Sequence, residues 1–162
     1  MRVFQEVVFR ISRGAAIVSA ALLVLMVLHI LTEIVLRSFF ASSTFVLDEF
    51  VGYGVAAMTF LSLGYALEDG SLIRVQLLLT RSPPPARRGL EALCAALTLA
   101  LSLFLIAHFW HSVSRNWSRG AVSQSIAEVP LWIPEGLVLL GLVLFALQLF
   151  AHLLRLLRPA RA

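Results

Sequence analysis

Charged residues and cysteines are scarce in this chain, and lysine is missing altogether. Charged residues make up 14% of the 162 residues, hydrophobic residues make up 60%, and the mean hydropathy is +0.93. A soluble domain of this length cannot bury so much apolar surface, so the composition predicts a protein that is solvated by a lipid bilayer. The only cysteine, Cys94, lies within an apolar run, which excludes an intrachain disulfide.

The 13 basic residues are all arginine and outnumber the acidic residues, which gives a pI near 10.6. In a soluble protein this pI would suggest nucleic-acid binding. Here the arginines lie at the ends of apolar runs, so they predict membrane topology and no nucleic-acid partner. Cys94 has no cysteine nearby, Gly120 lies outside any phosphate-binding pattern, and no Gly-x-Ser-x-Gly motif is present. We therefore expect no enzyme activity, metal or cofactor.

Four apolar runs are long enough to cross a bilayer: residues 14–36, 50–67, 90–110 and 131–154. Each must be a helix, because backbone polar groups within a bilayer need partners in their own segment. The connections are short, so consecutive helices should be antiparallel neighbours. The sequence predicts an all-α integral membrane protein with four transmembrane helices, forming a single membrane domain over residues 1–162.

The distribution of arginines predicts the orientation of these helices. Ten arginines fall on the side of the two termini and the second connection, and three fall on the other side. The ten are Arg2, Arg10, Arg13, Arg74, Arg81, Arg87, Arg88, Arg155, Arg158 and Arg161, and the three are Arg37, Arg115 and Arg119. Because cytoplasmic connections carry the excess of arginine, both termini are expected in the cytoplasm.

Two segments beside the spans have an amphipathic or apolar character. The residues before Gly14 alternate apolar and polar side chains, which suits either a short helix in the cytoplasmic interface or a simple extension of the first span. The first run is too long for the core of a cleaved signal peptide, so we expect no cleavage there. Residues 72–79 are too apolar for a free loop and too few to span, so we expect them along the inner interface.

Three polar residues share one face of the first helix: His29, Glu33 and Arg37 follow at intervals of four. Glu33 could be a proton or ion ligand. The interpretation we favour is a polar stripe that packs against another helix, with Glu33 paired to Arg37 in the favourable order for a helical ion pair.

Asp48 and Glu49 begin the second helix. They could complement the positive end of the helix dipole, meet Arg37 across the short first connection, or recognise a basic surface on a partner outside the membrane.

The four histidines raise the alternative of a haem-binding membrane redox subunit. His29 and His108 are the two that could face each other from different helices. Their predicted depths differ by roughly 7 Å at 1.5 Å per residue, so they are a poorly matched pair of axial ligands.

Three segments, in order along the chain, resemble the small membrane subunit of tripartite ATP-independent periplasmic (TRAP) transporters. The first segment is Val35-Leu36-Arg37-Ser38-Phe39-Phe40. The second comprises Leu47-Asp48-Glu49-Phe50, followed by Gly64 and by the turn Gly70-Ser71-Leu72-Ile73-Arg74-Val75. The third is Pro130-Leu131-Trp132. The turn departs from the family pattern at Ser71, Leu72 and Gln76, and Val46 and Leu47 stand where the family often has a tryptophan.

This resemblance implies the small permease subunit of a secondary transporter in the bacterial inner membrane. A periplasmic solute-binding protein would deliver an organic acid to a large membrane subunit that carries the transport pathway, driven by an ion gradient that is commonly sodium. This chain would then act as a scaffold and docking partner, with Glu33, Arg37, Asp48, Glu49 and Arg74 as candidate interface or structural residues. A free-standing channel or transporter is the remaining alternative.

Overall fold

The computed structural model describes residues 2–71 and 84–156. Within these residues the regular elements are four helices: α1 (Arg2–Phe40), α2 (Leu47–Asp69), α4 (Pro84–Arg119) and α5 (Trp132–Leu156). All four are long and apolar enough to cross a membrane. The predicted all-α protein with four membrane-spanning helices is therefore confirmed. The position of Arg74 and the expected interfacial segment 72–79 lie outside the described residues.

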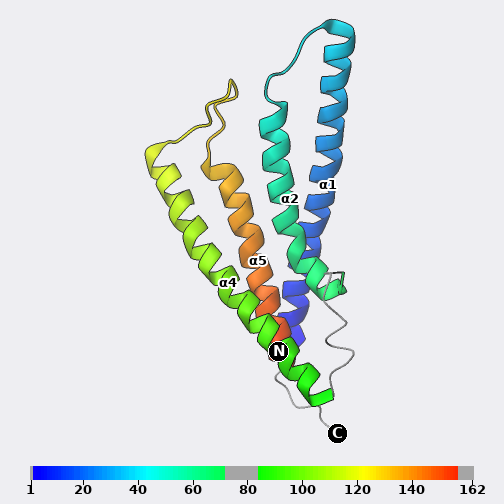
Figure 1. Cartoon of the computed structure of the whole chain (residues 1–162), viewed down its shortest axis with the longest axis vertical. Helices are drawn as coiled ribbons and strands as arrows, with labels where there is room; N and C mark the ends of the chain where they lie inside the picture. Colours follow the sequence, from blue (N-terminus) through cyan, green and yellow to red (C-terminus); the bar gives the residue numbers. More distant parts are fainter. Residues whose placement is uncertain (1, 72–83, 157–162) are drawn as a thin grey trace.

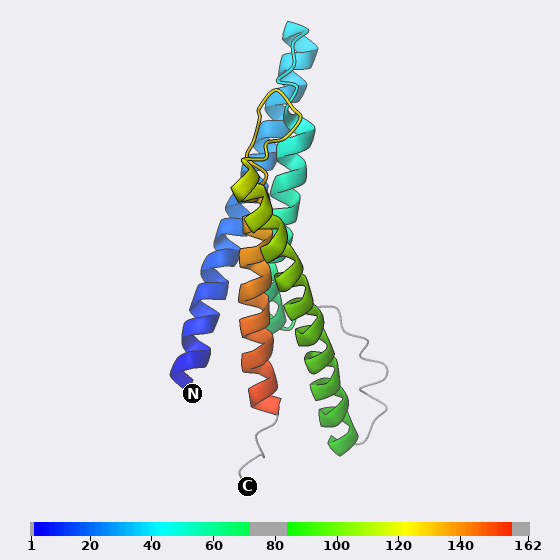
Figure 2. The same cartoon turned by 90° about the vertical axis from the view of Figure 1, so that its left-hand side faces the viewer.

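The helices stand side by side in the order α1, α2, α5, α4 (Figure 1). Successive described helices run in opposite directions, so the first turn of α1 and the last turn of α5 lie at the same end of the bundle (Figures 1 and 2). The α1–α2 and α4–α5 connections lie at the opposite end, where α1 projects beyond its neighbours. Below, the connection end is the one that carries these two loops.

Helix α1 is longer than the predicted span at both ends. It runs without interruption over 39 residues, about 58 Å at 1.5 Å per residue. The segment before Gly14 continues the same helix, and Val8 and Ser12 are buried there against the bundle. Of the two interpretations of this segment, the structure shows the extension of the first span.

Helix α5 is the most enclosed of the four and supplies most of the core. Leu142, Leu149 and Ala151 of α5 are buried, as are Ala57 and Leu61 of α2. The two helices approach closely at Gly141, because a Cβ built there would lie 2.5 Å from the carbonyl carbon of Phe60. Any larger residue at this position would have to push α2 and α5 apart.

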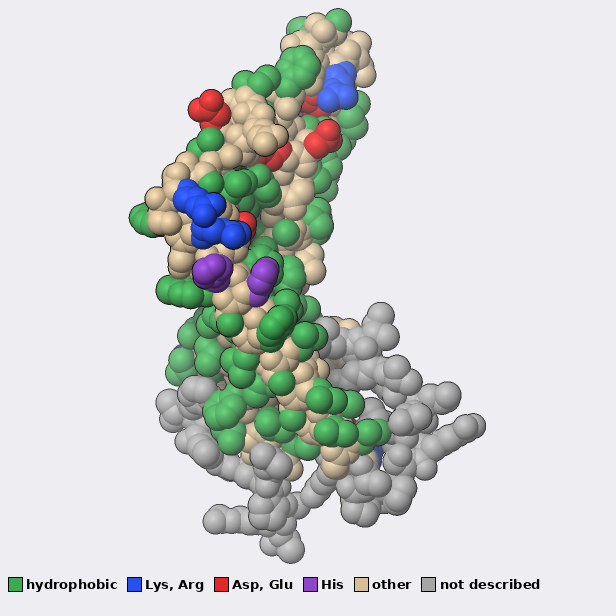
Figure 3. Space-filling view, turned by 60° about the vertical axis from the view of Figure 1, so that its left-hand side comes forward, with side chains coloured by type: hydrophobic (Ala, Val, Ile, Leu, Met, Phe, Trp, Pro, Cys, Tyr) green, Lys and Arg blue, Asp and Glu red, His purple; other side chains and the backbone are tan. Residues whose placement is uncertain are grey.

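Polar and apolar surface are segregated along the bundle. Large apolar side chains are exposed along α1 and α4, as expected for helices that face lipid. Figure 3 shows charged and histidine side chains gathered towards the connection end, above a largely hydrophobic middle. The surface therefore has the banding of a protein that crosses a membrane.

Candidate functional site

Glu33 is the most deeply buried acid of the described residues, with 1% of its surface exposed. Its carboxylate accepts four hydrogen bonds from the end of α1 and the connection that follows. The donors are Arg37 Nε (2.9 Å) and the Ser43 hydroxyl, both to Oε1, and the Thr44 amide (3.1 Å) and hydroxyl (2.6 Å), both to Oε2. We call Glu33, Arg37, Ser43 and Thr44 the Glu33 cluster.

The Glu33 cluster folds the α1–α2 connection back onto the helix that precedes it. Arg37 also donates a hydrogen bond to the Ser43 hydroxyl (3.3 Å), which in turn accepts one from the Phe45 amide (3.2 Å). A carboxylate has about four acceptor positions, so the four donors fill those of Glu33. The predicted Glu33–Arg37 pair is present, and the saturated carboxylate favours a structural role over that of an ion ligand.

Asp48 and Glu49 occupy the first turn of α2 but have different surroundings. Asp48 is exposed at the helix terminus, where its charge complements the helix dipole. Glu49 accepts a hydrogen bond from the Tyr53 hydroxyl (2.8 Å), and Ser123 and Ser125 of the α4–α5 connection lie beside its carboxylate. Among the described residues no ion pair joins Arg37 to either acid. Glu49 therefore lies where the start of α2 approaches the α4–α5 connection.

The α4–α5 connection is itself braced by polar contacts. Asn116 donates to both carboxylate oxygens of Glu135 at 2.9 Å, and the rings of Trp117 and Trp132 pack edge to face with their centroids 4.5 Å apart. These contacts tie the end of α4 to the start of α5.

The two histidines of the haem alternative do not face each other. His29 lies on α1 with its ring 6.2 Å from that of Phe50, whereas His108 lies exposed on α4. Helices α2 and α5 stand between α1 and α4 (Figure 1). The bundle therefore does not bring these two side chains together as axial ligands.

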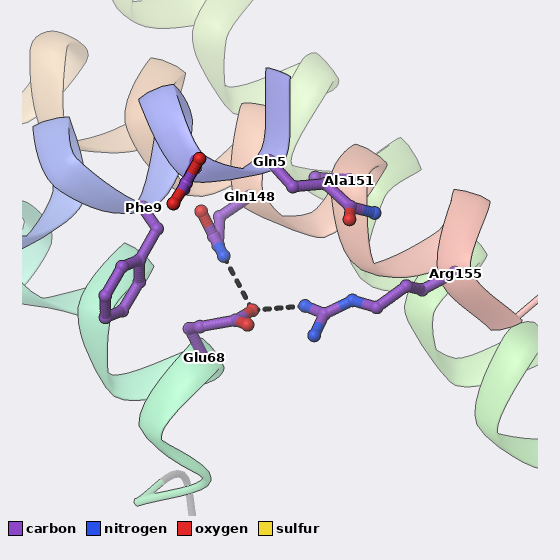
Figure 4. Close-up of a pocket in the computed structure, with 7 residues that line it drawn as sticks. Gln5, Phe9, Glu68, Gln148, Ala151 and Arg155 are labelled. Atoms are coloured by element: carbon purple, nitrogen blue, oxygen red, sulfur yellow. Dashed lines mark hydrogen bonds and ion pairs between the residues drawn. The ribbon is translucent and has the colours of Figure 1, made fainter. Parts of the chain in front are cut away.

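A second polar cluster lies at the opposite end, where α1 begins, α2 ends and α5 ends. Glu68 Oε2 accepts a hydrogen bond from Gln148 Nε2 (2.8 Å) and forms an ion pair with Arg155. His152 lies near the same carboxylate. We call Glu68, Gln148 and Arg155 the Glu68 cluster. Figure 4 shows Gln148 and Arg155 reaching Glu68 from α5.

The Glu68 cluster borders a cavity of about 320 Å³. Helix α1 contributes Gln5, Glu6 and Phe9 to its wall, opposite Glu68, Gln148, Ala151 and Arg155 (Figure 4). This cavity was not predicted from the sequence. The available signal was Gln148, a polar residue deep inside an apolar run, because such a residue is expected to have a polar partner on another helix.

These two clusters hold polar side chains of neighbouring segments together. Among the described residues no three histidine, cysteine or acidic side chains gather in a way that would hold a metal ion. The described polar groups thus form structural joints, and one of them borders the cavity beside Glu68.

The sequence was also compared with known proteins. Residues 26–159 match the family described as tripartite ATP-independent periplasmic transporters, DctQ component. Comparison with curated proteins gave no match, and neither did comparison with solved structures. The family match covers most of the chain and includes the three segments on which the resemblance rested.

Proposed function

This chain belongs to the DctQ component family of the tripartite ATP-independent periplasmic transporters, and on that premise we propose that it is the scaffold subunit of a three-part importer. A separate large membrane subunit carries the transport pathway, and a periplasmic solute-binding protein delivers the substrate, an organic acid. The chain is a multi-pass membrane protein, which we assign to the bacterial inner membrane.

The observation that carries this proposal is the placement of charge. A path for an organic acid needs cationic groups or helix termini near the middle of the membrane. The described arginines instead lie towards the helix ends, and the described helices run unbroken across their spans. Glu33, the most deeply buried of the described acids, has its acceptor positions filled by α1 and the connection that follows. A transport path is therefore better placed in another subunit.

The orientation follows from the arginine distribution. Ten of the 13 arginines fall on the side of the termini, so we assign that end of the bundle to the cytoplasm. The connection end, with Glu33, Arg37, Asp48 and Glu49, then faces the periplasm. This end is where a binding protein would dock.

Co-purification tests the scaffold assignment. Tagged chain expressed with the large hydrophobic subunit and the secreted binding protein encoded beside it should purify with the large subunit. Uptake of an organic acid in reconstituted vesicles should require all three proteins. Uptake by vesicles that hold this chain alone would overturn the proposal.

Reporter fusions test the orientation. A fusion after Arg81 and one at the C-terminus should report the cytoplasm, and one after Gly120 should report the periplasm. A periplasmic signal from the C-terminal fusion would contradict the assignment.

A further inference from the structure

The cavity beside the Glu68 cluster combines a polar wall with a position at the membrane surface. It lies among the first turns of α1 and the last turns of α2 and α5, next to the ends of the predicted first, second and fourth spans. Its volume of about 320 Å³ falls at the lower end of the range for small-ligand pockets, about 300–1,000 Å³. A lipid headgroup or a small molecule would fit in this volume.

One wall of the cavity holds a buried acceptor without a donor. Gln148 is 2% exposed, and its Oε1 has no hydrogen-bond partner among the described residues. Its Nε2 donates to Glu68, so turning the amide over would set Oε1 against a carboxylate oxygen. The amide is therefore held with its carbonyl unpaired, and a buried unpaired acceptor is costly unless a ligand or water supplies a donor.

The other polar groups of the wall also favour a ligand that donates hydrogen bonds and carries positive charge. Glu6 reaches the cavity from α1 as a carboxylate without a partner among the described residues, and Glu68 adds a second acid. Phe9, whose ring stacks on that of Tyr65, supplies an apolar part of the wall. Acceptors thus exceed donors within the cavity.

Arg155 supplies the complementary charge at the rim. It pairs with Glu68, but 45% of its side chain stays exposed, and a guanidinium has five N–H donors. The donors left over suit an anionic oxygen lying outside the cavity, such as that of a phosphate. Acceptors inside and a guanidinium at the rim match a group with an ammonium tip and a phosphate behind it.

We propose that this cavity binds the headgroup of an aminophospholipid, with its primary ammonium on Gln148 and Glu6 and its phosphate on Arg155. The ammonium supplies the donor that Gln148 Oε1 lacks. The position at the end of the bundle places the cavity at headgroup level, where such a lipid is present at high concentration. This inference does not depend on the transport role, because it concerns the chain by itself.

Native mass spectrometry of the full chain in detergent tests the proposal. Phosphatidylethanolamine and phosphatidylcholine with identical acyl chains are added separately, because the methyl groups of choline remove every N–H donor. We expect phosphatidylethanolamine to bind about tenfold more tightly, since a hydrogen bond between charged groups contributes enough for that ratio. Equal binding of the two lipids would overturn the proposal.

Three variants locate the site. Gln148→Met and Glu6→Gln should each reduce the preference for phosphatidylethanolamine several-fold, and the exposed position of Glu6 keeps the test valid if Gln148→Met does not fold. Glu91 lies near the start of α4, at the same end of the bundle but outside the cavity, so Glu91→Gln should leave the preference for phosphatidylethanolamine unchanged. A preference that survived in Glu6→Gln and in any folded Gln148→Met would refute the assigned site.

Competition by soluble glycerophosphoethanolamine tests whether the ligand is a membrane lipid or a soluble amine. We expect it to compete only at far higher concentration than the lipid, because it lacks the acyl chains that hold the headgroup at the surface. Competition at equal concentration would make a soluble amine the ligand and would overturn the lipid assignment.

Discussion

The Glu33 cluster and the Glu68 cluster contain the same kinds of groups but are assembled in opposite ways. Every member of the Glu33 cluster falls within one helix end and the connection after it, and its carboxylate has no vacant acceptor position. The Glu68 cluster joins residues 80 and 87 positions apart and leaves Gln148 Oε1 unpaired. A local cluster can close on itself and fix a turn, whereas a cluster that forms only when two helices pack together can leave room for a ligand.

The largest loss of stability should come from disrupting the Glu33 cluster. Glu33→Ala removes the acceptor of four hydrogen bonds and leaves the Thr44 amide without a partner. We expect the melting temperature in detergent to fall by about 8–12 °C, at 2–4 °C per kcal/mol for a chain of this size.

Arg37→Ala distinguishes the contribution of the ion pair to stability from that of the other hydrogen bonds in the Glu33 cluster. Three donors to Glu33 remain, and Arg37 is 60% exposed, so the loss should be less than half as large. Equal losses in the two variants would mean that the charge of Arg37, and not the folded connection, holds the cluster together.

A smaller effect should come from pushing apart α2 and α5, the helices that carry the Glu68 cluster. In Gly141→Ala the new Cβ meets the backbone of Phe60 and Leu61, so α2 and α5 must move apart and carry Glu68 away from Gln148. We expect the melting temperature to fall by about 3–8 °C, because forced overpacking costs about 1–3 kcal/mol.

Gly136→Ala is the matched control on the same helix. A Cβ at Gly136 meets nothing within 4 Å, so this variant should be neutral or slightly more stable. If Gly141→Ala behaved in the same way, the close approach of α2 and α5 would not be what positions the Glu68 cluster.

The smallest expected effect is the energetic coupling between Glu68 and Gln148 within the Glu68 cluster. A double-mutant cycle with Glu68→Gln and Gln148→Leu should give a coupling energy of about 1 kcal/mol, because one hydrogen bond to a partly exposed carboxylate is lost. Thermal or denaturant unfolding of the four proteins measures it. Strict additivity would show that the bond between the two side chains contributes nothing to stability.

The sequence was informative wherever the signal was local. Four apolar runs sufficed to predict four spans, and the four-residue spacing sufficed to predict the pair of Glu33 and Arg37, because both depend only on neighbours in the chain. The ends of α1 were less well predicted, since hydropathy falls at the membrane surface while the helix itself continues to Arg2 and Phe40.

Contacts between distant segments could not be predicted in this way. Nothing near Glu68 in the sequence indicates that Gln148 will reach it, and nothing near Glu49 points to Ser123. Both contacts depend on which helices are neighbours in the bundle and on how each is rotated about its axis. Those variables are set by packing, as at Gly141, and they leave only a weak trace in a single sequence.

Helix α1 is one rigid rod that contributes to the cavity wall near one end and to the Glu33 cluster near the other, and this restricts its length more than its composition. Glu6 and Phe9 must reach the cavity near its first turn while Glu33 meets the connection near its last. Inserting or deleting one residue between them would rotate one end about 100° relative to the other and shift it by about 1.5 Å. Substitutions on the lipid-facing side of α1 should therefore be tolerated, whereas insertions and deletions between its two ends should not, because even a full turn would move one end by about 5.4 Å.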